Sequence, residues 1–279
     1  MFTFEYSFPC IGRPIFIVII NTHHHHMHRI YSLLFILLLS LSCTSQQKKS
    51  KILFITTNVD VLNGAPNGTY LIEFAVPFAK FSEAGYSVDL ISPKGGKIPI
   101  YHSGDTTDVI KKVIKSELFV HKTNNTLVPS EINAKNYAAV IIPGGYGQFW
   151  DTHQNKDIQE LISSIYENGG TIGSLGHGTA TLINVKLRSG AYLVKDKTMT
   201  SFPSWNEKNI MKQSNYGQLL PYDMEVELQK RGANLKIYNH EKKTNYEVVD
   251  MENRLVTAAF ASGGNFVAEQ VIKSINQQD

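Results

Sequence analysis

Short continuous apolar runs alternate along this chain with longer stretches in which apolar residues recur at helical spacing. Runs of this kind, bounded by glycine, proline and asparagine, are typical of strands buried on both faces, as in parallel sheets. The predicted strands are 51–57, 87–92, 137–142, the run that ends at Leu175, 193–200, 235–238, 246–249 and 255–259. The predicted helices are 70–84, 106–118, 157–168, 223–230 and 265–275. This alternation predicts one α/β domain, a three-layer sandwich with a mostly parallel central sheet.

The segment Gly169–Leu182, with the sequence GGTIGSLGHGTATL, organises the rest of the pattern. It predicts a short buried strand, a sharp turn over 175–178 and the first turn of a helix. A strand-to-helix corner of this kind presents one side chain above a sheet, beside the free amides of the helix start. The apex of this corner is Gly176, which has no side chain to present.

The most apolar stretch of the chain is 30–42, IYSLLFILLLSLS. At about 1.5 Å per residue it is short for a hydrocarbon core of about 30 Å, and it fits the apolar region of a signal peptide. Met27-His28-Arg29 supplies a start residue and a positive charge just before it. We therefore predict that translation starts at Met27; the alternative is a longer leader from Met1 or an uncleaved anchor.

The leader ends in Ser40-Leu41-Ser42-Cys43, which resembles a bacterial lipobox, although Ser40 stands where leucine is usual. The resemblance implies cleavage before Cys43 and a lipid on its sulfur. We expect a leader over 1–43, a polar tether over 44–50 and one folded domain over 51–279. The expected location is the bacterial cell envelope, with the protein lipid-anchored to a membrane and facing away from the cytoplasm.

Charge and cysteine usage exclude several classes of function. The formal net charge of +3 is too small, and the lysines too dispersed, to favour a nucleic-acid partner. Both cysteines, Cys10 and Cys43, lie in the leader, so the folded domain has no disulfide, cysteine metal site or cysteine nucleophile. The histidine run 23–26 lies in the leader too, and the other histidines lack ligand spacing. We predict no metal and no cofactor.

Five segments in register resemble one family. They are 68–77 (GTYLIEFAVP), 84–96 (AGYSVDLISPKGG), 143–151 (PGGYGQFWD), the corner at Gly176 and 255–257 (LVT). The chain resembles the ThiJ/PfpI superfamily, and within it the glyoxalase III branch, whose members are also described as chaperones and deglycases. The resemblance covers about residues 51–275 and implies a flavodoxin-like, class I glutamine amidotransferase-like fold.

The resemblance also implies roles for individual residues. In the family the corner reads Cys-His-Gly-Pro-Ala, and the cysteine is the nucleophile. Carried over by position, Gly176 occupies the place of the nucleophile, the assisting histidine is His177, and the glutamate that touches the thiol in the family is Glu73. The amides of the oxyanion side belong to Gly144 and Gly145.

Four further positions follow from the same resemblance. Tyr146 and Gly178 are expected at the pocket. The branch often places an acid after a Phe-Pro step to orient the histidine, and here Phe202-Pro203 is followed by Ser204 at that position, with Glu207 three residues later. Ser204 and Glu207 are therefore the two candidate orienting residues.

The missing thiol decides how these residues are interpreted. Thiol addition to an α-oxoaldehyde needs a thiolate, and neither Ser174 nor Thr179 lies at the apex to replace it. Glycine also removes the strain of a positive φ, which costs a larger residue about 1–3 kcal/mol. Glu73 is interpreted as a buried pocket group rather than a surface carboxylate. His177 has either a chemical role or a structural one in the turn.

Three functions remain open at this point. The first is a catalytically degenerate, lipid-anchored member that binds a small carbonyl or acyl compound, or a partner protein. The second is an active hydro-lyase that converts methylglyoxal to lactate, or a deglycase or amidase of the family, using Glu73 and His177. The third is a chaperone-like scaffold. A homodimer is a further expectation, since relatives of this type are often dimeric.

Overall fold

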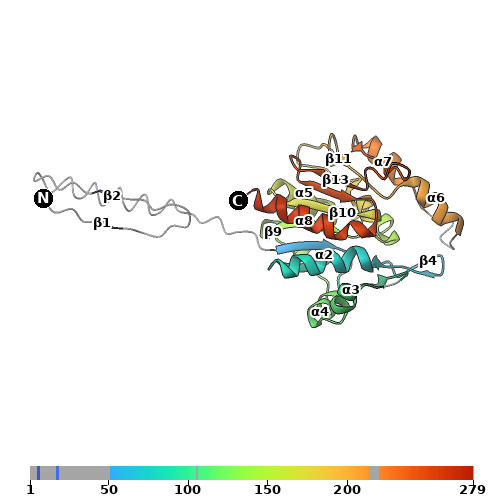
Figure 1. The fold of residues 1–279 in the computed structure, drawn as a ribbon, viewed down its shortest axis with the longest axis horizontal. Helices are drawn as coiled ribbons and strands as arrows, with labels where there is room; N and C mark the ends of the chain where they lie inside the picture. The colour runs from blue at the N-terminus through green and yellow to red at the C-terminus, as the bar shows by residue number, and fades with distance from the viewer. Residues whose placement is uncertain (1–4, 7–16, 19–50, 105, 214–219, 279) are drawn as a thin grey trace, which may run out of the picture. The chain divides into compact units, whose positions relative to one another are not determined.

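The computed structural model describes residues 5–6, 17–18, 51–104, 106–213 and 220–278, drawn in colour in Figure 1. The chain divides into two compact units, Met1–Lys48 and Lys49–Asp279. In the first unit, β1 (Glu5–Tyr6) pairs antiparallel with β2 (Ile17–Val18). The predicted start at Met27, the lipobox-like segment with Cys43 and the tether over 44–50 lie outside the described residues.

A six-stranded sheet forms the centre of the second unit, in the order β13-β14-β10-β9-β3-β7. Its strands are β3 (Lys51–Ile55), β7 (Ser87–Ile91), β9 (Tyr137–Ile142), β10 (Thr171–Leu175), β13 (Glu247–Asp250) and β14 (Leu255–Ala258). Neighbours pair in parallel except β13 and β14, which are antiparallel. The prediction of an α/β fold with a mostly parallel sheet is confirmed.

Alternate residues of the central strands face two separate apolar cores. On β3, Ile52 and Phe54 belong to one core, while Leu53 and Ile55 belong to the other. Such alternation follows from the two-residue repeat of a strand, and it explains why the whole run is apolar. The unit Lys49–Asp279 contains both cores complete.

Helices cover both faces of the sheet, as Figure 1 shows. The core with Ile52 and Phe54 packs under α2 (Leu71–Glu83) and α8 (Gly264–Asn276). The opposite core packs under α5 (Lys156–Glu167) and α7 (Met224–Lys230). All four helices were predicted within two residues of these bounds.

Three segments differ from the prediction. The helix expected over 106–118 is two helices, α3 (Asp108–Ile114) and α4 (Glu117–Asn124), because the Ser116 hydroxyl accepts a hydrogen bond from Phe119 N and caps a new helix. The strand expected over 193–200 is only β11 (Thr198–Met199), and the strand expected over 235–238 is only β12 (Asn234–Leu235). These two short strands pair in parallel with each other and not with the central sheet. The apolar residues before β11 are buried without strand pairing.

A further helix, α6 (Ser204–Gln213), follows β11 at a position where no helix was expected. Short strands and 3-10 turns complete the unit: β4 (Val61–Leu62), β5 (Ala65–Pro66), β6 (Thr69–Tyr70), β8 (Ile100–Tyr101), η1 (Pro129–Glu131), η2 (Ala134–Asn136), η3 (Tyr146–Phe149), η4 (Gly176–Leu182) and η5 (Ala261–Gly263). Within the described ranges, no helix is both long and apolar enough to cross a membrane.

Candidate functional site

The strand-to-helix corner lies where β10 ends at Leu175 and η4 begins at Gly176. The segment after the corner is a 3-10 helix rather than the predicted α-helical turn. Gly176 has a φ of +48°, the left-handed region that glycine adopts at little cost. A Cβ at Gly178 would overlap the carbonyl of Ile142, so only glycine lets η4 pack directly against the end of β9. The corner therefore keeps the backbone of a nucleophile elbow.

The Glu73 carboxyl fills the space in front of the apex. Glu73 lies in the first turn of α2 and is 5% exposed. A Cβ added to Gly176 would lie 2.6 Å from Glu73 Oε1. The other carboxyl oxygen, Oε2, accepts a hydrogen bond from Gly144 N at 2.5 Å. The carboxyl thus occupies the position where a side chain at the apex would begin.

The same burial changes the acidity of Glu73. Loss of solvation raises its pKa to about 7, although the nearby His177 and the hydrogen bond from Gly144 both act to lower it. A carboxyl with a pKa near neutrality can exchange a proton under physiological conditions. Glu73 is therefore a buried acid-base group and not a surface carboxylate.

His177 is held between two aromatic rings and one carboxylate. Its Nε2 lies 2.6 Å from Glu207 Oε2, and the Tyr146 hydroxyl donates to Glu207 Oε1 at 3.0 Å. The ring centroids of Tyr146 and Phe202 lie 4.5 and 4.4 Å from that of His177. Burial alone would lower the pKa of His177, but the charge and hydrogen bond of Glu207, with the charge of Glu73, raise it above its ordinary value.

The structure separates the two candidate orienting residues. Glu207 contacts His177, whereas the Ser204 hydroxyl donates to Asp223 Oδ1 at 2.6 Å. Ser204 begins α6 and Glu207 lies one turn further along it. No helix was expected at these positions. The spacing of three residues between Ser204 and Glu207 therefore did not show which of the two side chains faces His177.

The two glycines expected on the oxyanion side are differently placed. The amide of Gly144 already donates to Glu73, so it is not free to bind a ligand oxygen while that carboxyl stays in place. Gly145 has a φ of +119°, and a Cβ there would overlap the carbonyl oxygen of Gly68. These close approaches explain why the sequence has two glycines after Pro143.

Phe202 belongs to the site, although the sequence predicted no role for it beyond marking the Phe-Pro step. Its ring covers His177 and also contacts Phe260, at 5.2 Å between centroids. Tyr146 covers His177 as well, so the imidazole is enclosed and only 8% of the residue is exposed. The Phe-Pro step was the one sequence feature that pointed to Phe202. It could not identify the residue that Phe202 contacts, because His177 lies 25 positions earlier in the chain.

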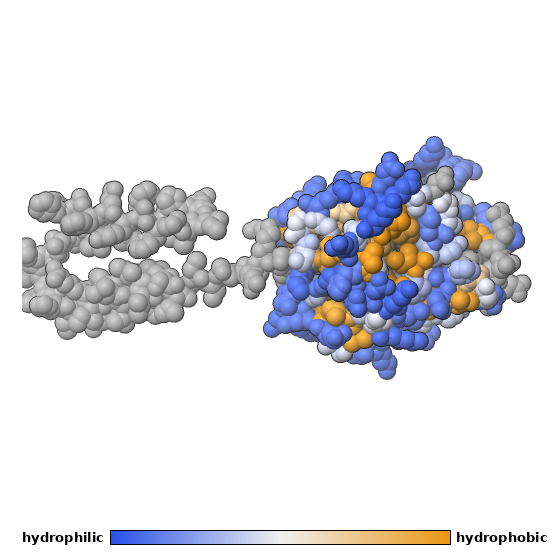
Figure 2. Space-filling model, turned by 90° about the horizontal axis from the view of Figure 1, so that it is seen from below, coloured by the Kyte–Doolittle hydropathy of each residue, from blue (hydrophilic) through white to orange (hydrophobic). Residues whose placement is uncertain are grey.

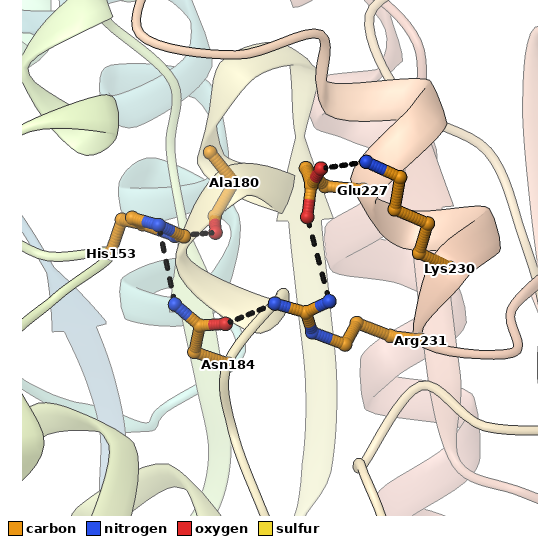
Figure 3. A network of polar contacts seen from close by, with 6 residues as sticks. All are labelled: His153, Ala180, Asn184, Glu227, Lys230 and Arg231. Carbon is orange, nitrogen blue, oxygen red and sulfur yellow. Dashed lines mark hydrogen bonds and ion pairs between the residues drawn. The ribbon is translucent and has the colours of Figure 1, made fainter.

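A polar network ties the end of η4 to α7, as Figure 3 shows. His153 Nδ1 lies 3.2 Å from the carbonyl oxygen of Ala180, and His153 Nε2 lies 3.2 Å from Asn184 Nδ2. Asn184 in turn accepts a hydrogen bond from Arg231, which pairs with Glu227. Burial lowers the pKa of His153, so the neutral ring is favoured there.

A pocket of about 360 Å³ lies beside Glu207, on α6 and the start of α7. Its apolar wall consists of Phe149, Phe202, Met211, Leu220, Tyr222 and Met224. Glu207 and Phe202 line the pocket and also contact His177. Glu73 and Gly176 do not line the pocket. In the described part of the chain, no group of three or more histidine, cysteine, aspartate or glutamate side chains could hold a metal ion.

The chain is similar in sequence and fold to known proteins. The sequence profile of the DJ-1/PfpI family matches residues 60–274, and the chain therefore belongs to this family. It is 29% identical over 170 residues to the glutathione-independent glyoxalase HSP31 of Saccharomyces cerevisiae, covering 57% of this chain and 70% of that protein. It is 27% identical over 166 residues to glyoxalase 3 of Candida albicans, covering 55% and 70%.

Solved structures agree with the fold. The Rapid Encystment Protein of Francisella tularensis superposes with a TM-score of 0.70 at 28% identity, covering 81% of this chain and 99% of that one. The glyoxalase III of Candida albicans superposes with a TM-score of 0.67 at 24% identity, covering 81% and 98%. The resemblance to the ThiJ/PfpI superfamily and to its glyoxalase III branch is confirmed at the level of homology.

Proposed function

We propose that this protein binds a small carbonyl or acyl compound in a glyoxalase III-like site and does not turn it over by thiol chemistry. The observation that carries the proposal is Gly176, at the apex of an otherwise intact elbow, with the Glu73 carboxyl in the space of the missing side chain. Without a thiol at the apex, the covalent thiohemiacetal of thiol chemistry does not form at the carbonyl carbon.

No neighbouring hydroxyl replaces the thiol. Ser174 Oγ and Thr179 Oγ1 lie 2.9 Å apart and hydrogen-bond to each other, and both residues are fully buried. A hydroxyl that is buried and engaged in this way lacks both access to a ligand and a base to activate it. This supports a site with binding groups and no nucleophile.

A second candidate is a feeble, thiol-free hydro-lyase that converts methylglyoxal to lactate, favoured by the pKa of about 7 at Glu73. In the hydrate of methylglyoxal, a base removes the proton from the carbon that bears both hydroxyls and returns it to the neighbouring carbonyl carbon. One hydroxyl proton of the hydrate moves to the former carbonyl oxygen, which gives lactic acid. Water is taken up on hydration, and no oxidant or reductant is required. General acid-base catalysis of this kind raises the reaction rate by about 10²–10⁴-fold, so the turnover would be slow.

The two candidates separate in one experiment on residues 49–279, the unit that contains both cores. Methylglyoxal consumption and lactate formation are measured for the wild type, Gly176→Cys and Glu73→Gln. We expect an inert wild type and an active Gly176→Cys variant. Turnover by the wild type that is lost in Glu73→Gln would instead establish the thiol-free enzyme.

A matched control separates a restored site from a merely reactive thiol. Gly190 also has a positive φ, of +85°, and a Cβ there would meet open space. Gly190→Cys therefore adds an accessible cysteine away from the elbow. If this control consumed methylglyoxal and formed lactate as fast as Gly176→Cys, the elbow would not be the cause.

The lipid anchor is a proposal supported only by the sequence around Cys43, after an apolar leader. Metabolic labelling of the full chain with a radioactive fatty acid, followed by membrane fractionation, tests it. Cys43→Ser should abolish both labelling and membrane association, whereas Cys10→Ser should leave them unchanged. Equal labelling of Cys43→Ser and the wild type would contradict the anchor.

The scaffold alternative has its own observation. Figure 2 shows an apolar patch in the middle of one largely hydrophilic face. Large apolar side chains are also about half exposed at Val109 on α3 and at Leu118 and Val120 on α4. Light scattering from a heat-aggregating client protein, with and without this chain, tests the role. Unchanged aggregation would leave ligand binding as the better proposal.

A further inference from the structure

The pocket beside Glu207 has a composition that goes beyond the Glu73–His177 cluster. Its volume of about 360 Å³ lies within the range of small-molecule sites. The wall is mostly apolar: Phe149 and Met224 belong to the core, and Met211 comes from α6. Such a wall favours the apolar body of a ligand over a fully polar one.

Two lysines, Lys208 and Lys212, line the same pocket from α6. They are four residues apart on a helix, so their side chains lie on one face of it. No described residue forms an ion pair or a hydrogen bond with either lysine, and both are exposed. The charge of Lys208 acts on the nearby Glu225, whose pKa burial raises. Both ammonium groups thus keep donors for a ligand.

The two acidic residues of the wall are already engaged. Both oxygens of Glu207 are occupied, by Tyr146 and by His177. Asp223 Oδ1 accepts hydrogen bonds from Ser204 and from Val226 N, where it caps α7. These carboxylates thus already accept hydrogen bonds within the protein, whereas neither lysine of the pocket donates to a described residue. The hydrogen-bonding groups that the pocket offers to a ligand are therefore mainly the two ammonium groups.

We infer that this pocket binds a small apolar carboxylate, with the carboxylate at Lys208 and Lys212 and the hydrocarbon part against Phe149 and Met224. The inference rests on the ligand-binding part of the proposed function and specifies the ligand class and its place. A cationic ligand would be repelled by the two ammonium groups, and a neutral ligand would leave both of them without an anionic partner.

Glu207 connects the pocket with the elbow, because it lines the pocket and also contacts His177. The carboxylate that lines the pocket is the one that holds His177 Nε2 at 2.6 Å. Phe202 has the same double position, on the pocket wall and on the His177 ring. A ligand in the pocket therefore packs against two of the groups that fix the imidazole.

The test is calorimetric titration of residues 49–279 with octanoate, octan-1-ol and octylamine, which share one chain and differ in charge. We expect octanoate to bind at least about tenfold more tightly than the alcohol, and octylamine to bind least. The double variant Lys208→Gln/Lys212→Gln should weaken octanoate binding by about tenfold and leave the affinity for octan-1-ol unchanged. The matched control Lys112→Gln/Lys115→Gln, two exposed lysines at the end of α3, should change neither.

A second variant, Met211→Trp, fills the pocket and should weaken both octanoate and octan-1-ol. Equal binding of octanoate and octylamine, octanoate binding unaffected by the Lys208/Lys212 variant, or no binding of any probe would overturn the inference. Methylglyoxal turnover is measured on the same preparations. Turnover by the wild type would overturn the proposed lack of catalysis alone, since it does not depend on which probe enters the pocket.

Discussion

The two carboxylates on either side of His177 are the same residue type in opposite environments. Glu73 comes from α2, is closed off from solvent and has one hydrogen bond, from the backbone of Gly144. Glu207 comes from α6, keeps 13% of its side chain exposed and is bound by two side-chain donors. Burial without enough donors favours the protonated form of a carboxyl, whereas paired donors favour the ionised form. The comparison assigns proton exchange to Glu73 and charge pairing to Glu207.

The largest effect is expected for the paired carboxylate. Glu207→Ala removes the acceptor of Tyr146 and His177 and leaves two nearly buried donors without it, which should cost about 4 kcal/mol of unfolding free energy. Urea unfolding of the variant measures this cost. Lys208→Ala, at the next and exposed position of α6, should cost less than about 0.5 kcal/mol. Similar losses of unfolding free energy in both variants would show that any alanine substitution in α6 has this effect, and that the contacts of Glu207 with Tyr146 and His177 are not its cause.

The second prediction concerns the pH dependence that Glu73 creates. With a pKa of about 7 in the folded state against 4.5 in the unfolded one, the folded chain holds a proton that the unfolded chain releases between these values. The free energy of unfolding should therefore fall as the pH rises through this window, by about 3 kcal/mol. The raised pKa of His177 acts in the same direction above 6.5.

Urea unfolding at a series of pH values measures this dependence for the wild type and Glu73→Gln. The variant should show a clearly flatter profile, because it lacks the proton that the folded wild type holds at Glu73. Glu117→Gln, at an exposed position of α4, should leave the wild-type slope unchanged. A Glu73→Gln profile as steep as that of the wild type would contradict the assignment of proton exchange to Glu73.

The third prediction concerns the space that Glu73 has taken. Gly176→Ala introduces a side chain at a positive φ and displaces Glu73 Oε1, so it should cost about 2 kcal/mol. Gly190→Ala has a similar backbone requirement with open space around it and should cost about 1 kcal/mol. Thermal unfolding gives the difference between them. Equal costs would mean that the Glu73 carboxyl moves aside freely.

The smallest effect is expected for Ser204. Ser204→Ala removes one hydrogen bond to Asp223 and should cost about 1 kcal/mol or less. The His177 pKa, followed by nuclear magnetic resonance, should not change in this variant, whereas Glu207→Gln should lower it. A shift in Ser204→Ala as large as that in Glu207→Gln would restore Ser204 as an orienting residue.

Most of the fold could be predicted from the sequence because it depends on local patterns. The apolar runs at Lys51–Ile55 and Tyr137–Ile142 are buried strands of a parallel sheet, as expected. The prediction was wrong at 106–118 and at 193–200. In the first case Ser116 caps a new helix, and in the second case the apolar residues are buried without a strand partner. Apolar periodicity reports burial, and it does not report which backbone groups find partners.

The sequence by itself determined the family, the fold class and the absence of a side chain at Gly176, because these are properties of the chain order and of one residue type. Only the tertiary structure decided that Glu73 fills the vacant apex, that Glu207 and not Ser204 contacts His177, and that Phe202 covers the imidazole. These contacts join α2, η4 and the β11–α6 segment, which are far apart in the sequence. Their geometry depends on how helices rotate over a common sheet, and no local pattern encodes that rotation.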